Sequence, residues 1–191
     1  MRQISILFFC FLFLFQSKIQ GQNFTQSDTL RGSITPERAW WDLQHYDLVV
    51  TLLINNKSLV GKNTISYRAL TAYDTKYTAE RSSLDTKSAL MQIDLQGLMK
   101  IDSVLQNGQR LSFTNQGPAH FIELIQKHEL DKIYQVTCYF SGAPIVAQNP
   151  PWDGGFTWDS DDLGRPFIAN ANQGIGASVW WPNKDHPYDE P

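Results

Sequence analysis

The side chains best suited to bind a metal ion are four histidines that lie far apart along the 191-residue chain: His45, His120, His128 and His186. A catalytic zinc site usually takes three ligands from the protein, and a common helical zinc motif supplies two of them as HExxH. His128 and Glu129 are followed by Leu-Asp-Lys, so the second histidine of that motif is missing. We therefore predict that His128 is a solvated turn residue, that His45 and His120 are structural, and that this chain holds no metal.

The chain also lacks a complete set of residues for nucleophilic catalysis. Ser178 follows Gly176 and Ala177, which does not match the G-x-S-x-G turn that exposes a nucleophilic serine. Cys138 lies in an alternating apolar run between Val136 and Phe140, where a small buried thiol is the more common finding. We expect no catalytic residue in this chain.

The last 43 residues carry the densest set of tryptophans, glycines and aspartates. A turn is predicted at 153–155 (DGG) and a second at 159–164 (DSDDLG), where a solvated hairpin tip is favoured over a calcium loop because the spaced ligands of an EF-hand are missing. Four tryptophans follow or flank these turns: Trp152, Trp158, Trp180 and Trp181. They could form an aromatic platform for sugars or pack against a partner domain, and the sequence leaves both readings open.

The elements that would position these residues are predicted to be β-strands. Tyr46, Leu48, Val50 and Leu52 alternate within 40–53, and alternation resumes in 59–70 after an Asn-Asn-Lys turn, which predicts a hairpin. Further alternating runs occupy 91–98, 121–125 and 132–142, and Asn107-Gly108 predicts a tight hairpin within 100–113. No convincing amphipathic helix exceeds two turns. The fold class we predict is all-β, an antiparallel β-sandwich or a set of curved sheets.

Residues 1–21 are predicted to be a signal peptide, since Arg2 precedes an apolar run over 6–15 and a polar stretch ending at Gly21. Export to the periplasm or the extracellular space follows, and Cys138 would be the only cysteine of the mature chain. We expect a flexible N-terminal arm over 22–39 with little to bury, one domain over 40–191, and a long loop over 71–88. The formal charge of −3 gives no reason to expect a nucleic-acid partner.

Two stretches of the terminal segment, PWDGGFTWDSDDLGRPFIA (151–169) and NQGIGASVWWPNKDHPYDEP (172–191), carry a family resemblance. They closely resemble the end of the N-terminal domain in the zinc aminopeptidase family that includes aminopeptidase N and leukotriene A hydrolase. Weaker resemblance lies in HYDLVVTL, LVGKNTISYRA and MQIDLQGLMKIDSVLQNGQRLSF. The resemblance covers 40–191 and is closest to the secreted bacterial branch.

The resemblance implies a saddle-like antiparallel β domain that packs on a downstream, thermolysin-like catalytic domain. In the family, which acts on peptide substrates, zinc is held in that catalytic domain by HExxH and a distant Glu, and the GxMEN exopeptidase motif lies in the same domain. Neither motif occurs here. The resemblance therefore implies a fragment that is inactive alone, with zinc only in the full-length enzyme.

One substrate-binding residue, Gln173, is implied by the resemblance. In the family a Gln or Glu at this position holds the free α-amino group of the peptide, and some members carry a second Gln where this chain has Ala171. The amide of Gln173 could instead satisfy its own loop backbone. The alternative function is a stand-alone secreted β-sandwich that binds glycan or protein through exposed tryptophans.

Overall fold

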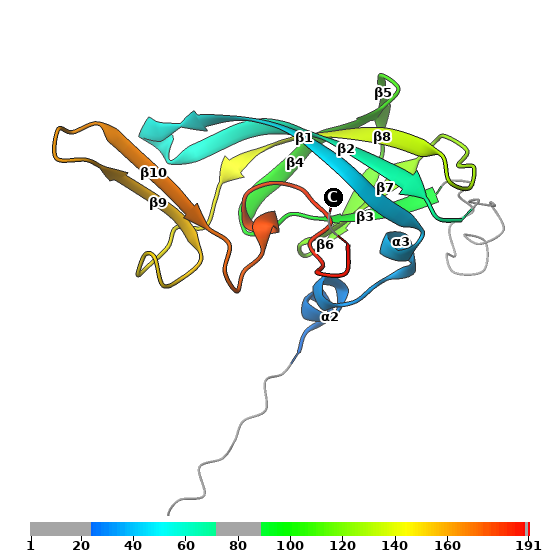
Figure 1. Cartoon of the computed structure of the whole chain (residues 1–191), viewed down its shortest axis with the longest axis horizontal. Helices are drawn as coiled ribbons and strands as arrows, with labels where there is room; N and C mark the ends of the chain where they lie inside the picture. Colours follow the sequence, from blue (N-terminus) through cyan, green and yellow to red (C-terminus); the bar gives the residue numbers. More distant parts are fainter. Residues whose placement is uncertain (1–23, 72–88, 190) are drawn as a thin grey trace, which may run out of the picture.

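A computed structural model of the chain describes residues 24–71, 89–189 and 191. The predicted signal peptide and nearly all of the predicted loop over 71–88 lie outside these residues. The described part is all-β, as predicted: its ten strands form three antiparallel sheets, accompanied by two short α-helices (Figure 1). Among the described residues, no helix is long and apolar enough to cross a membrane.

The largest sheet has five strands in the order β1-β2-β8-β4-β5. Its members are β1 (Trp41–Leu53), β2 (Ser58–Ala69), β8 (Ile133–Ala143), β4 (Leu98–Gln106) and β5 (Gln109–Leu111). The hairpin predicted over 40–70 is β1 and β2, joined by the short 3-10 helix η1 (Ile54–Asn56). The hairpin predicted at Asn107-Gly108 joins β4 to β5, and both of its turn residues adopt positive φ, 51° and 78°.

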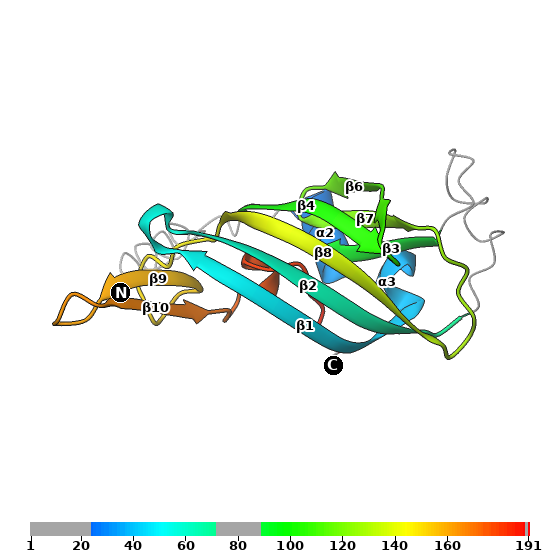
Figure 2. The same ribbon diagram turned by 90° about the horizontal axis from the view of Figure 1, so that it is seen from above.

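Two smaller sheets complete the fold. The second has the order β3-β7-β6, formed by β3 (Ala89–Asp94), β7 (Ala119–Leu124) and β6 (Phe113–Gln116). The third is the hairpin of β9 (Gly155–Ser160) and β10 (Pro166–Ala171), which projects from one end of the molecule (Figures 1 and 2). The main core lies between the first two sheets, and the terminal segment runs along the concave side of the long sheet (Figure 1).

A bulge in β1 explains why its two halves face the core with different residues. Trp41 and Leu43 are buried, and the register then shifts between Leu43 and His45. An extra residue reverses which face later side chains occupy. Tyr46, Leu48 and Val50 consequently pack against the core, as their alternation predicted.

The strand predicted over 91–98 is interrupted in the structure. β3 ends at Asp94 and β4 begins at Leu98, and the two strands belong to different sheets. Gly97 adopts a φ of +67°, a left-handed conformation that glycine tolerates and that lets the chain turn between the sheets. The uninterrupted apolar alternation concealed this turn.

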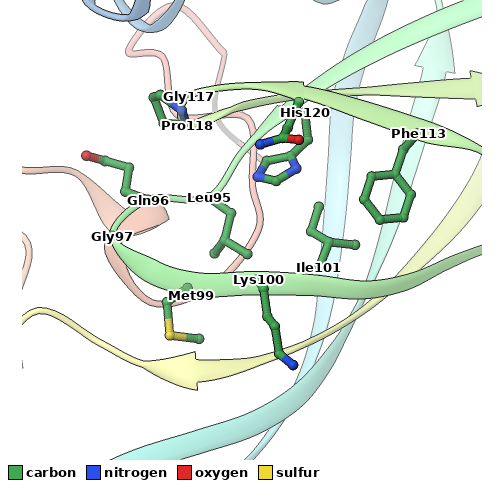
Figure 3. Close-up of a pocket in the computed structure, with 11 residues that line it drawn as sticks. Leu95, Gln96, Gly97, Met99, Lys100, Ile101, Phe113, Gly117, Pro118 and His120 are labelled. Atoms are coloured by element: carbon green, nitrogen blue, oxygen red, sulfur yellow. The ribbon is translucent and has the colours of Figure 1, made fainter.

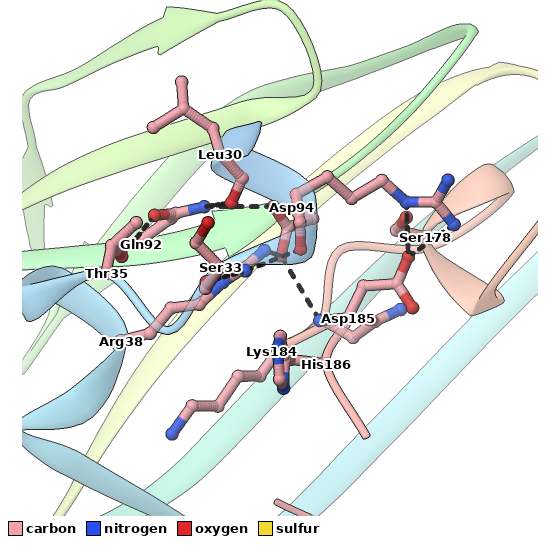
Figure 4. Close-up of polar contacts among 12 residues, drawn as sticks. Leu30, Ser33, Thr35, Arg38, Gln92, Asp94, Ser178, Lys184, Asp185 and His186 are labelled. Atoms are coloured by element: carbon pink, nitrogen blue, oxygen red, sulfur yellow. Dashed lines mark hydrogen bonds and ion pairs between the residues drawn. The ribbon is translucent and has the colours of Figure 1, made fainter. Parts of the chain in front are cut away.

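The segment over 24–39 is built into the domain, although we expected it to bury little. It forms helix α2 (Gln26–Gly32), which starts at a capping box of Thr25 and Asp28, and helix α3 (Pro36–Ala39). Arg38 of α3 is fully buried, pairs with the buried carboxylate of Asp94, and donates to the backbone oxygens of Arg31 and Ser33 (Figure 4). Arg38 is therefore the buried anchor of a segment that has few apolar residues to bury, and Thr35 and Leu30 add hydrogen bonds with Gln92.

The last described residues are also part of the core. Asn183 exchanges two backbone hydrogen bonds with Asp94, and Lys184 donates to the Trp41 backbone oxygen and pairs with Asp189. Lys184 also lies over the Trp41 ring, 3.9 Å from its centroid. These contacts hold residues 183–189 against β1 and β3.

Candidate functional site

No group of three or more His, Cys, Asp or Glu side chains that could hold a metal ion occurs in the described part of the chain. Cys138 is fully buried in β8, and burial raises the pKa of its thiol to about 12. A thiol in that state is a core side chain and no nucleophile. The predicted structural role of Cys138 therefore agrees with its surroundings.

The prediction of a solvated turn at His128 is wrong. The side chain is buried, its Nε2 lies 2.7 Å from the Tyr67 hydroxyl, and its ring packs edge-on against Trp40 and Tyr134. Burial lowers the pKa of His128 to about 4, so the imidazole is neutral at pH 7. His128 is flanked by charged residues in the sequence, so no local pattern indicated that its ring packs among aromatic side chains.

A cavity of about 540 Å³ opens between the β3–β4 connection and the β6–β7 turn (Figure 3). Its walls are both polar and apolar: Leu95, Ile101 and Phe113 lie around the ring of His120, and Gln96, Lys100 and Asn115 also line the cavity. His120 is 7% exposed, and burial lowers the pKa of its imidazole. A neutral histidine without an acidic partner among the lining residues gives this cavity no evident catalytic chemistry.

Three of the four terminal tryptophans pack together instead of forming an exposed platform. Trp158 stacks on Phe156 at 5.4 Å, Trp180 meets Phe156 edge-on at 5.8 Å, and Trp181 packs against Tyr46 at 4.7 Å. All three lie against the main core. Only Trp152 of the four is strongly exposed, at 87%, so the arrangement does not favour a sugar platform built from these rings.

The aspartate-rich segment forms the tip of the β9–β10 hairpin. Asp161 accepts hydrogen bonds from the backbone N–H groups of Leu163 and Arg165 and pairs with the Arg165 side chain. This is the hairpin tip favoured by the sequence.

Gln173 lies in a short loop, residues 172–176, that follows β10 and precedes the 3-10 helix η2 (Ala177–Val179). We refer to it as the Gln173 loop. Gln173 is exposed, and its side chain makes no hydrogen bond to any residue in the described ranges.

The backbone of the Gln173 loop is held firmly from the side of the core. The Ile175 carbonyl accepts a hydrogen bond from the Arg31 guanidinium and another from Gln96 Nε2, at 3.0 Å for the latter. Gly154 packs so closely beneath the loop that an added Cβ would collide with Ile175 and lie 2.9 Å from the Gln173 carbonyl oxygen. Neither Arg31 nor Gln96 belongs to any motif in the sequence, and only the folded chain identifies them.

The chemistry available at this loop is recognition. The amide oxygen of Gln173 can accept a hydrogen bond from an ammonium group, and its amide N–H can donate to a carbonyl. An exposed amide on a restrained backbone suits a ligand that carries both groups, because the loop needs little ordering when it binds.

Comparisons with known proteins bear on the fold alone. No family model matches the chain, and no curated protein matches it by sequence. A mutant of the M1 zinc metallopeptidase from Deinococcus radiodurans, solved by crystallography, matches 80% of this chain and 30% of its own, at 18% identity and a TM-score of 0.54. Yeast LTA4 hydrolase in complex with bestatin matches 78% of this chain and 21% of its own, at 14% identity and a TM-score of 0.57.

The chain thus spans less than a third of the length of these enzymes. At this identity the likeness establishes the fold, which is that of the N-terminal region of M1 aminopeptidases and LTA4 hydrolase. The resemblance expected from the sequence is confirmed to that extent. Another structure of the Deinococcus radiodurans enzyme contains the bound substrate Tyr-Ser-Ala.

Proposed function

We propose that this chain is the non-catalytic N-terminal domain of an exported zinc aminopeptidase that removes N-terminal residues from peptides. Its proposed contribution is to hold the free amino group of the substrate through Gln173. The covalently attached partner would be a thermolysin-like catalytic domain, and the working location would be the periplasm or the outside of the cell. The described residues provide no zinc site, so we assign no step of the hydrolysis to them.

The observation that carries this proposal is the state of Gln173. The side chain is exposed and makes no hydrogen bond within the described ranges, while two donors hold the backbone two residues away. An exposed amide can bond to a ligand, and the restrained backbone keeps that amide in one place. The fold of M1 aminopeptidases supports the proposal independently.

The first experiment is to sequence the gene beyond the codon for Pro191 and to express whatever the frame encodes. The proposal predicts HExxH and GxMEN motifs in that frame and zinc-dependent release of N-terminal residues from peptides. A stop codon directly after Pro191 would contradict the assignment to a peptidase.

Substrate anchoring is then tested with Gln173→Ala in the protein from the complete gene. A hydrogen bond to a charged group contributes about 1.5–3 kcal/mol, so we expect kcat/KM to fall about tenfold or more, mainly through KM. Gln173→Glu should retain binding because a carboxylate also accepts from an ammonium. Gln109→Ala, at an exposed glutamine on β5, is the matched control and should leave kcat/KM unchanged. Equal kinetics of the Gln173→Ala and Gln109→Ala variants would exclude anchoring.

A further inference from the structure

We propose that Arg31 and Gln96 are positioning residues for the Gln173 loop, so that helix α2 and the β3–β4 connection set the place from which Gln173 acts. This inference rests on the anchoring role proposed above for Gln173. It assigns a role to two residues that lie 142 and 77 positions away from Gln173 in the sequence.

The first support is that two separate segments meet on one carbonyl of the loop. The Arg31 guanidinium and the Gln96 amide both donate to the Ile175 oxygen. A carbonyl oxygen has two lone pairs, and here both are engaged by side chains from outside the loop. The Ile175 peptide is therefore fixed against rotation from two directions.

The second support is that both donors are themselves restrained. Gln96 Nε2 also donates to Ser178 Oγ at 2.6 Å, and Ser178 in turn donates to Asp185 Oδ2 at 2.6 Å. Arg31 approaches the same Asp185 oxygen at 3.4 Å. The side chain of Asp185 is 15% exposed, and the contacts of Ser178 and Asp185 lie beside the buried Arg38 and Asp94 pair (Figure 4). Because the donors share a partly buried carboxylate, they hold the loop as a unit and not as two loose surface contacts.

The third support is that the loop has little of its own to fix it. Gly174 and Gly176 both adopt positive φ, 76° and 78°, and glycine gives the backbone wide freedom on either side of Ile175. Within the loop, only the N–H groups of Ile175 and Gly176 bond, both to the Asn172 oxygen, at 3.2 and 2.9 Å. Without Arg31 and Gln96, we expect the loop to sample other conformations and Gln173 to lose its fixed position.

The direct test is amide hydrogen exchange on this chain, comparing wild type with Arg31→Met and Gln96→Met. Each variant keeps the bulk of the side chain and removes its donors. We expect exchange of the Ile175 and Gly176 amides to accelerate about tenfold in either variant, and further in the double variant, with unchanged protection in β2 and β8.

Matched controls remove similar groups elsewhere. Arg165→Met takes away the exposed guanidinium at the hairpin tip, and Gln135→Met takes away an exposed amide that bonds to Ser66. Both controls should leave exchange in the Gln173 loop unchanged. Because Arg31 and Gln96 lie in different segments, one variant still tests the inference if the other fails to fold. Unchanged loop exchange in the folded variants overturns it, whatever the activity of the protein.

Kinetics on the protein from the complete gene separate this inference from the proposed function. If Arg31→Met and Gln96→Met raise KM for the tripeptide Tyr-Ser-Ala as Gln173→Ala does, with kcat nearly unchanged, the positioning role is supported. If Gln173→Ala raises KM and the two variants do not, positioning is overturned while anchoring stands. If Gln173→Ala itself has no effect, anchoring fails, and with it any role of Arg31 and Gln96 in binding substrate.

Discussion

Replacing Arg38 by methionine should strongly destabilise the domain, because it leaves the Asp94 carboxylate buried without its cation. Both side chains are fully buried, and among the described residues the Asp94 carboxylate retains only two donors, Gln92 Nε2 at 3.3 Å and the Asp185 backbone N–H at 3.2 Å. Breaking a buried pair by removing one partner costs about 3–5 kcal/mol. Two backbone oxygens, those of Arg31 and Ser33, also lose their donor.

Urea unfolding followed by tryptophan fluorescence measures this loss. With a slope of about 2 kcal/mol per molar urea, the midpoint should fall by about 2 M. Arg165→Met is the matched control: its ion pair with Asp161 is exposed, and such pairs contribute about 0–1 kcal/mol. If Arg38→Met lowers the midpoint no more than Arg165→Met, the reasoning about buried charge is wrong.

The pH dependence of the same variants identifies the cause. Burial raises the pKa of Asp94, and Arg38 opposes that rise. Without Arg38 the folded pKa rises further, so the cost is complete above that pKa and is relieved progressively as the pH falls from it towards the ordinary aspartate pKa of 3.8. The gap between Arg38→Met and wild type should therefore narrow as the pH is lowered from about 7 towards 3.8. In Asp94→Asn the unpaired guanidinium keeps its proton and the titrating carboxylate is gone, so the stability lost in this variant should not be recovered as the pH falls.

Two further predictions concern single residues. Gly108→Ala should lower the free energy of unfolding by about 1 kcal/mol because of its φ of 78° alone, since no atom lies within 4 Å of the added Cβ. The control is Gly32→Ala, where the added Cβ is equally unobstructed and φ is ordinary; urea unfolding should show no loss of stability or a gain. Burial lowers the pKa of His128 from 6.5 to about 4, so on acidification the unfolded chain binds a proton at this residue before the folded chain does. The free energy of unfolding therefore decreases as the pH falls between these two pKa values, by about 2 kcal/mol from pH 7 to pH 5. His128→Gln should flatten this dependence, and an unchanged slope would show that His128 does not carry it.

The strands were predictable because burial alternates along them with the period of the pleat. In β2 the buried residues Asn63, Ile65, Tyr67 and Ala69 follow each other at every second position, and the Asn107-Gly108 turn has the positive φ values that this dipeptide favours. Gly97 could not be recognised as a break, because the alternation continues on both sides of it and a turn between sheets leaves no local signal.

The charged residues of the core were not predictable from pattern. Arg38, Lys184 and Asp189 look like surface residues in sequence, and each is buried with the help of contacts that are distant in the chain. Arg38 pairs with Asp94. Lys184 and Asp189 pair with each other and also bond to the backbone of Trp41 and Leu43, respectively. The same reason hid His128, whose neighbours in sequence are charged while its neighbours in space are aromatic rings. Contacts between segments this far apart are properties of the assembled fold, and a local window of sequence does not contain them.

The family resemblance pointed to Gln173, whereas nothing in the sequence pointed to Arg31 or Gln96, the two residues that hold its loop. Arg38 connects the core to the Gln173 loop. Its guanidinium pairs with the buried Asp94 and also donates at 2.8 Å to the backbone oxygen of Arg31, and the side chain of Arg31 holds the loop. A buried ion pair in the core is thus two hydrogen bonds away from the loop. The interaction that anchors helix α2 therefore also helps to fix the place from which an exposed glutamine could meet a ligand.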